Sequence, residues 1–220
     1  MQLGFAFRTH GGHRAGAGRK PKNGGKAGVS HGPRPALKGR HPVHVTMKLC
    51  AGLPNIRHRA LATLVFDVLR AAKGRLGTRL VQISVQTNHI HIILETESRR
   101  ALSRAMQWLG ARMAHRLNKR LRRQGPVFAD RYHSRALATP LEVRNALVYV
   151  LQNHRHHASG VHGAPRRLKL DELSTAPYFD GFTVRVGRPP KDAPVVPAKT
   201  WLLRAGWKLH GLIALTEVPA

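Results

Sequence analysis

Two histidines separated by one residue, His89 and His91, are the side chains of this sequence best suited to hold a metal ion. They follow an alternating apolar run over residues 80–86, so we predict that they lie on a β-strand. Because side chains alternate along a strand, both imidazoles would project from one face while Ile90 enters a core on the other. Two such imidazoles can bind one divalent cation. The alternative is a pair of half-buried histidines whose neighbours satisfy their hydrogen bonds.

A tyrosine supplies the other reactive group, because its hydroxyl can attack phosphorus and form a covalent phosphotyrosine bond. We favour Tyr149 over Tyr132 and Tyr178, since it lies in a predicted helix with a stripe of polar side chains. Asn153 follows one turn later in that stripe and could give an oxygen ligand to a hard cation. With the two histidines it would hold Mg²⁺ or Mn²⁺, which would polarise a phosphodiester. The alternative is a tyrosine that only closes a helix–sheet interface.

The helix that carries the tyrosine has a clear predicted start. Thr139 is placed to act as N-cap, Pro140 suits the first helical position, and Glu142 closes a capping box. The helix should run to about residue 157. Glu95, which shares the strand face of the histidines, lies roughly 13 Å beyond His91 at the rise of a strand, so it is a poor third ligand.

The remaining pattern indicates the scaffold of the site. Residues 41–49 alternate as a half-buried strand, with His44 and Thr46 on its polar face. The other predicted elements are a helix starting at Asn55 and ending near 73, a long helix over 98–123, a short strand over 131–137 and a terminal helix over 198–213. The order strand, helix, strand, strand, helix, strand, helix, with helices on one face, predicts an α+β fold of ferredoxin-like type.

Charge indicates the partner. The 220 residues hold 38 Lys and Arg against 10 Asp and Glu, a formal net charge of +28. So large an excess favours binding to a polyanion, usually nucleic acid. The long helix carries basic side chains with no acid among them, which indicates a phosphate-facing surface. The predicted DNA-binding residues are Arg104, Arg112, Arg116, Lys119, Arg120, Arg131 and Arg135.

Other features limit the class of protein. The single cysteine, Cys50, excludes an internal disulfide framework and a zinc site with several cysteines. No apolar run is long enough to cross a bilayer, and no signal peptide is evident, so we expect a cytoplasmic, nucleoid-associated protein without a membrane partner. Residues 1–40 should form a disordered basic arm, 41–157 the catalytic domain, and 158–220 a C-terminal extension with auxiliary DNA contacts.

The segment Asn88-His89-Ile90-His91 resembles the HUH motif (histidine, hydrophobic residue, histidine) of single-tyrosine HUH transposases. The helix with Tyr149 and Asn153 is similar to the nucleophile helix of that family, and residues 125–133 resemble the segment that precedes it. The chain looks most like the REP-associated tyrosine transposases, relatives of the IS200/IS605 enzymes. The resemblance covers residues 41–157.

The resemblance implies metal-dependent cleavage and rejoining of single-stranded DNA at hairpin-bearing sites through a 5′-phosphotyrosine intermediate. It implies His89 and His91 as ligands, Tyr149 as nucleophile and Asn153 as third ligand. Relatives often have Asn-Pro at this point, but here His154 follows, so it and His157 are alternative ligands. The protein would be a monomer or a homodimer. The competing hypotheses are a noncatalytic, domesticated DNA-hairpin binder and a basic RNA-binding protein.

Overall fold

The computed structural model describes residues 37–158, 170–184, 186 and 192–219, all within one unit that spans Pro33–Ala220. The predicted basic arm lies almost wholly outside the described residues, as do 159–169 and 187–191. The elements in chain order are β1 (Val43–Lys48), α1 (Arg59–Ala72), β2 (Thr78–Val85), β3 (His89–Thr96), α2 (Arg99–Arg120), β4 (His133–Ala136), α3 (Pro140–Ala158), the 3₁₀ turn η2 (Ala176–Tyr178), α4 (Trp201–Arg204) and the 3₁₀ turn η3 (Gly206–His210).

Within the described residues the strands form one four-stranded sheet in the order β2-β3-β1-β4, and each neighbouring pair is antiparallel. α1 connects β1 to β2, and α2 connects β3 to β4. This is the connectivity and strand order of a ferredoxin-like fold. The predicted α+β class and architecture are therefore confirmed. β1 and β3 are the central strands, so side chains that project from them are held on both sides by the sheet.

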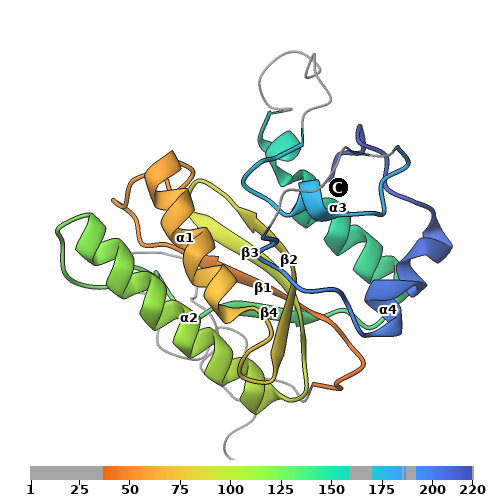
Figure 1. Cartoon of the computed structure of the whole chain (residues 1–220), viewed down its shortest axis with the longest axis horizontal. Helices are drawn as coiled ribbons and strands as arrows, with labels where there is room; N and C mark the ends of the chain where they lie inside the picture. Colours follow the sequence, from red (N-terminus) through yellow and green to blue (C-terminus); the bar gives the residue numbers. More distant parts are fainter. Residues whose placement is uncertain (1–36, 159–169, 185, 187–191, 220) are drawn as a thin grey trace, which may run out of the picture. The chain divides into compact units, whose positions relative to one another are not determined.

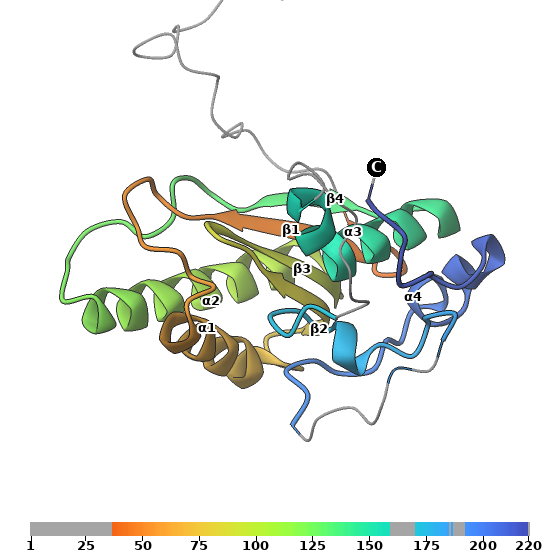
Figure 2. The same ribbon diagram turned by 90° about the horizontal axis from the view of Figure 1, so that it is seen from above.

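The helices lie on both faces of the sheet (Figures 1 and 2). α1 and α2 share a core with one face of the sheet, whereas α3 shares a second core that includes Ile93 of β3. The expectation that the helices occupy one face therefore holds for α1 and α2 only. The apolar side chains of α3 are too many for a single stripe, because Ala146, Leu147, Val148, Val150 and Leu151 are all buried.

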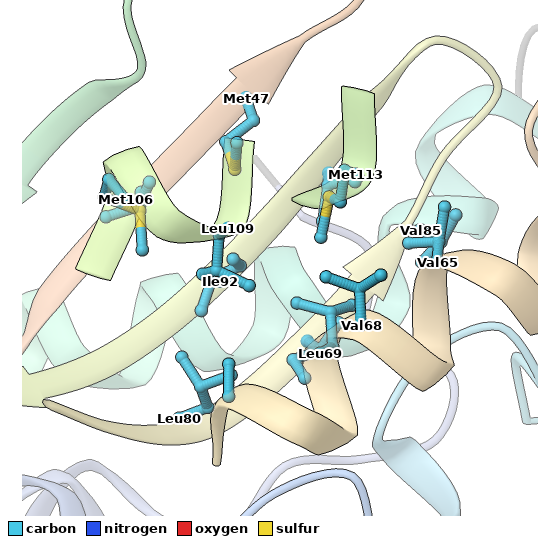
Figure 3. Close-up of a cluster of buried hydrophobic side chains, with 14 of the residues drawn as sticks. Met47, Val65, Val68, Leu69, Leu80, Val85, Ile92, Met106, Leu109 and Met113 are labelled. Atoms are coloured by element: carbon cyan, nitrogen blue, oxygen red, sulfur yellow. The ribbon is translucent and has the colours of Figure 1, made fainter. Parts of the chain in front are cut away.

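The core under α1 and α2 fixes the orientation of β3. Figure 3 shows Ile92 of β3 and Leu80 of β2 packed beneath Leu69 of α1 and Leu109 of α2. These side chains are fully or almost fully buried, and each contributes about 1.5–3 kcal/mol relative to exposure. With Ile92 held on this face, the residues on either side of it in β3 must project from the other face.

The predicted start of α3 is confirmed. The backbone N–H of Glu142 donates to Thr139 Oγ1 at 3.2 Å, and the Thr139 N–H donates to Glu142 Oε2 at 3.1 Å. These reciprocal bonds are the two halves of a capping box. Ser98 likewise caps α2, since its hydroxyl accepts from the Ala101 N–H at 3.1 Å.

Two predicted helices differ from the structure. α1 begins at Arg59 rather than at Asn55, because the Asn55 side chain accepts from the Arg57 N–H at 2.8 Å and forms a turn. The terminal helix is interrupted at Ala205, which lies between α4 and η3. A Cβ on Gly206 would lie 2.6 Å from the Trp201 ring, so only glycine allows this close packing.

The described part of the C-terminal extension packs against the rest of the fold. Trp207 and Ile213 are buried in the same core as α3. Arg144 of α3 binds both carboxylate oxygens of Glu217, at 2.6 and 2.9 Å. The backbone of Leu173 pairs with Val85 at the edge of β2, which covers an otherwise open strand edge. The extension therefore packs against both α3 and the β2 edge of the sheet.

Asp171 anchors the start of this extension, and we expect its removal to be costly. Its buried carboxylate accepts from both terminal nitrogens of Arg57, at 3.0 and 2.7 Å, and from the Leu173 N–H. An Asp171→Ala change leaves Arg57 without its partner, so the free energy of unfolding should fall by about 2–4 kcal/mol. Urea denaturation measures the effect. Asp180→Ala, at an exposed position of the same segment, should change stability by less than about 0.5 kcal/mol.

Candidate active site

His89 and His91 lie on β3 as predicted and meet on one face of the sheet. Their ring centroids are 4.6 Å apart with the planes nearly perpendicular. His91 is 3% exposed, and its partner on the central neighbour β1 is Thr46. Ile90, between the two histidines, is completely buried in the core on the other face. The strand therefore fixes the two imidazoles side by side, as the alternating pattern predicted.

A third histidine that the sequence reasoning did not select, His44, also belongs to this site. His44 Nε2 lies 3.2 Å from His91 Nδ1, and Thr46 Oγ1 lies 3.1 Å from the same nitrogen. Both residues come from the polar face of β1, which the alternating pattern of residues 41–49 had identified. These hydrogen bonds fix the ring orientation of His91.

Tyr149 reaches the histidines from α3. Its ring centroid lies 5.0 Å from that of His91 and 6.0 Å from that of His44, with edge-to-face geometry in both pairs. Tyr149 is partly buried, so one part of the ring packs on the site while another part is open to solvent. The helix and the histidine strand belong to the same chain. A phenol and paired imidazoles, which are 58 residues apart from His91 to Tyr149 in sequence, therefore share one site.

The amide of Asn153 is the most unusual polar group on α3. Asn153 is 1% exposed, and neither its Oδ1 nor its Nδ2 has a hydrogen-bond partner. A buried amide without partners costs about 1–3 kcal/mol, so such groups normally bind something. Its neighbour Gln152 is held elsewhere, since Gln152 Nε2 donates to the Ala214 carbonyl at 2.7 Å. The side chains of His154 and His157 lie outside the described part of the chain.

The described residues contain no group of three His, Cys, Asp or Glu side chains placed to hold a metal ion. A site built on His89 and His91 therefore needs a donor of another kind, and the Asn153 amide is a side chain of that kind. Glu95 does not supply it, because its carboxylate accepts from the backbone N–H groups of Lys199 and Thr200. His89, His91 and Asn153 are thus of the donor types that a two-histidine, one-amide site needs.

A cavity of about 420 Å³ adjoins the tyrosine and the third histidine. Arg135 and Glu142 line it and form an ion pair at 2.7 Å. Arg135, followed by the Ala138 N–H, lowers the pKa of Glu142, so this carboxylate stays ionised and bound to its partner. Glu217 and Pro219 of the extension line the same cavity. The space beside Tyr149 is therefore bordered by strand, helix and extension.

The predicted DNA-binding residues fall in two places. Arg135 projects from β4 beside the site, since it pairs with His44 of β1. The predicted residues of α2 are exposed, but their helix packs on the opposite face of the sheet; they are Arg104, Arg112, Arg116, Lys119 and Arg120. Helical spacing indicates which side of α2 is buried, but it does not indicate which face of the sheet receives it. The α2 surface is therefore separated from Tyr149 by the sheet.

The other two tyrosines lie away from the paired histidines. Tyr132 packs against the core beneath α1 and α2, and its hydroxyl lies 3.4 Å from Ser103 of α2. Tyr178 ends the short 3₁₀ turn of the extension. Tyr149 is therefore the tyrosine that the fold brings to His91.

The environment of His44 gives a testable pH dependence. Burial, and then repulsion by His133 and Arg135, lowers the pKa of His44 from 6.5 to about 4. Between these values the unfolded chain binds a proton that the folded chain rejects, so stability should fall as pH decreases from 6.5 to 4. The full effect is about 3 kcal/mol, and it is absent above pH 7. Urea unfolding with EDTA should show this slope in the parent and a weaker slope in His44→Gln; equal slopes would contradict the assignment.

Comparison with known proteins relates part of the chain to a family. Residues 53–153 match the family model described as "Transposase IS200 like". No curated protein matches the sequence. A solved REP-associated tyrosine transposase bound to a REP hairpin is similar at 14% identity and a TM-score of 0.47, over 59% of this chain and 74% of that chain. A protein from Deinococcus radiodurans R1 assigned as a transposase is similar at 15% identity and a TM-score of 0.35, over 63% and 100%.

The family match covers most of the fold that carries the candidate site, but it does not include β1 with His44. It begins before α1 and ends at Asn153, so it includes β3 with its two histidines and the part of α3 with Tyr149. Among the described residues no helix has the length and apolarity to span a membrane. Residues 53–153, a little under half of the chain, therefore match the IS200-like transposase family.

Proposed function

We propose that this transposase cleaves and rejoins single-stranded DNA near hairpin-bearing sequences, with Tyr149 as the nucleophile and a divalent cation as cofactor. The observation that carries the proposal is the contact between Tyr149 and His91, whose ring centroids lie 5.0 Å apart. A phenol beside a candidate cation site is the arrangement that transfer of a phosphodiester to tyrosine requires.

The proposed cation ligands are His89, His91 and Asn153. His91 would bind through Nε2, because its Nδ1 side faces Thr46 and His44. The buried Asn153 amide, which has no partner, would supply the oxygen ligand. When bound, Mg²⁺ or Mn²⁺ would polarise the phosphodiester and offset the charge that develops on it. Two imidazoles form a softer donor set than Mg²⁺ prefers, so we expect Mn²⁺ to bind more tightly.

The reaction conserves the energy of the bond that it breaks. The Tyr149 hydroxyl oxygen attacks phosphorus and loses its proton, while the bond from phosphorus to the 3′-oxygen breaks. That oxygen leaves with a proton as a 3′-hydroxyl, and the 5′-phosphate remains attached to Tyr149. Attack of another 3′-hydroxyl on the phosphotyrosine bond reverses the step and joins the strands without a nucleoside triphosphate.

Charge on the two faces suggests how DNA is divided between them. Arg135 lies beside the cavity next to Tyr149, so we assign it and Arg131, in the same segment, to the phosphates that flank the cleaved bond. The basic face of α2 lies behind the sheet, so we assign it to DNA outside the cleavage site, such as the hairpin stem.

Because Tyr149 meets His91 of its own chain, we propose that one chain forms a complete site. A net charge of +28 supports residence on the nucleoid.

An adduct assay tests this function. The full chain is incubated with a 5′-labelled and a 3′-labelled single-stranded hairpin DNA and with Mg²⁺, Mn²⁺ or EDTA. We expect a covalent complex that survives denaturation, forms only with metal, and retains the 3′ label, because the 5′-phosphate stays on the protein. Mass spectrometry of the digested complex should place the nucleotide on Tyr149.

Two results would overturn the proposal. Tight hairpin binding without an adduct in any metal would favour a noncatalytic hairpin binder. Preference for RNA over DNA of the same sequence would favour the RNA-binding alternative. A Tyr149 adduct that forms equally well in EDTA would remove the cation from the mechanism and keep the nucleophile.

A further inference from the structure

The C-terminal extension carries an exposed tryptophan that the proposed chemistry does not use. Trp201, the first residue of α4, is 59% exposed, whereas Trp207 in the following turn is 1% exposed. Tryptophan side chains are normally positioned by burial against apolar neighbours, and an exposed tryptophan lacks that stabilisation. The local backbone nevertheless holds this ring in place. The benzo edge of the indole lies against Gly206, where a Cβ would come within 2.6 Å of the ring.

The surface around this ring is basic. Lys199, Arg204 and Lys208 are exposed within nine residues of Trp201, and the sequence from 199 to 210 contains no acidic residue. The carboxylate nearest in the fold, Glu95, is already bound to the backbone N–H groups of Lys199 and Thr200. An exposed indole ring that packs on glycine and has cationic side chains around it can stack on a nucleic-acid base and bind the phosphates next to that base.

We propose that Trp201 is a stacking platform for an unpaired base of single-stranded DNA, with Lys199, Arg204 and Lys208 on the adjacent phosphates. The assignment of the nucleic acid as DNA rests on the proposed function. The nearby cavity of about 730 Å³ is a weaker candidate, because Asp180 and Asp192 line it together with Arg204 and Lys208. Its charge is balanced, so the DNA contact belongs to the Trp201 surface.

The platform would give the transposase a second hold on its substrate. Stacking on an aromatic ring tolerates every base, because each has a π-face, so the contact would add affinity without adding sequence preference. Three phosphate contacts would also make binding depend on salt, with a slope of about −2 in a plot of log affinity against log salt for single strands. Trp201 would thus hold a flanking strand while α3 presents Tyr149 to the cleaved bond.

The test separates this contact from catalysis. The full chain carrying Tyr149→Phe is titrated with labelled oligo(dT), which has no hairpin, in EDTA, and anisotropy reports the affinity. Trp201→Ala should weaken binding by roughly 5- to 150-fold, and Trp201→Phe should keep most of the affinity. Gly206→Ala should also weaken binding, because its methyl group displaces the ring. Leu209→Ala, which removes an apolar side chain that is 72% exposed in the same segment, is the matched control and should bind as the parent does.

Fluorescence provides a second readout that does not depend on the alanine variant folding. Binding of oligo(dT) should quench the emission of the parent, and Trp201→Phe should lose most of that quenching. Equal affinity of the parent and Trp201→Ala, or equal quenching of the parent and Trp201→Phe, would overturn the proposal. Self-association that Trp201→Ala abolishes at unchanged DNA affinity would also overturn it and identify the surface as a contact between copies. None of these readouts involves cleavage, so a failed adduct assay leaves them interpretable.

Discussion

A Tyr149→Phe variant should form no covalent adduct with hairpin-bearing DNA, and its cleavage rate should fall by at least about a thousandfold. The change removes only the hydroxyl and keeps the ring that packs on His91 at 5.0 Å. We therefore expect an unchanged melting temperature and unchanged hairpin affinity. Denaturing gels of 3′-labelled hairpin DNA measure the adduct, and single-turnover cleavage measures the rate.

The chain supplies matched controls for this experiment. Tyr132→Phe removes a hydroxyl near Ser103, on the opposite face of the sheet, and Tyr178→Phe removes one from the extension. Both variants should form the adduct at the parental rate. A different result would assign the nucleophile to another tyrosine. In that case Tyr149→Phe would still form the adduct, and Tyr132→Phe or Tyr178→Phe would not.

An Asn153→Leu variant should become more stable and much less active. Leucine has a similar volume and removes a buried amide that has no hydrogen-bond partner, so without metal the free energy of unfolding should rise by about 1 kcal/mol. The same change removes the proposed oxygen ligand and should weaken Mn²⁺ affinity by roughly 100-fold. Urea denaturation in EDTA measures the stability, and the rise in melting temperature with Mn²⁺ measures the affinity.

Asn145→Leu is the matched control, since Asn145 lies two turns earlier on α3 in the same polar stripe but is exposed. It should show neither the gain in stability nor the loss of Mn²⁺ affinity. Full Mn²⁺ affinity in Asn153→Leu would exclude this amide as a ligand and would direct attention to His154 and His157. A loss of stability in EDTA would show that the amide already has a role in folding.

The sequence predicted the elements of this fold better than their spatial relations. Alternation places His89 and His91 on one strand face, and a capping box places the first turn of α3, because both signals are local. The position of α3 on the histidine face depends on which core its apolar side joins, and this is decided by contacts distant in sequence. The apolar surface of α3 is wider than one stripe, and this width indicates that both the sheet and the extension pack against the helix.

His44 is a second example of a spatial relation that the sequence pattern did not predict. The alternating pattern of residues 41–49 put His44 on a polar strand face, but it could not reveal which strand lies beside that face. The hydrogen bond between His44 and His91 exists because β1 and β3 are neighbours in the sheet. The predicted start of α1 was wrong for a local reason, because an asparagine such as Asn55 can close a turn as well as cap a helix.

The cover that the extension places over α3 has a consequence for synthesis of the protein. The sheet and its paired histidines can assemble once β4 has left the ribosome. The core that α3 shares with the extension stays incomplete until Trp207 and Ile213 have been synthesised. A nascent chain therefore carries the histidine pair before its tyrosine is fixed in place. If the proposed function holds, translation itself delays the completion of the DNA-cleaving site until the extension has been synthesised.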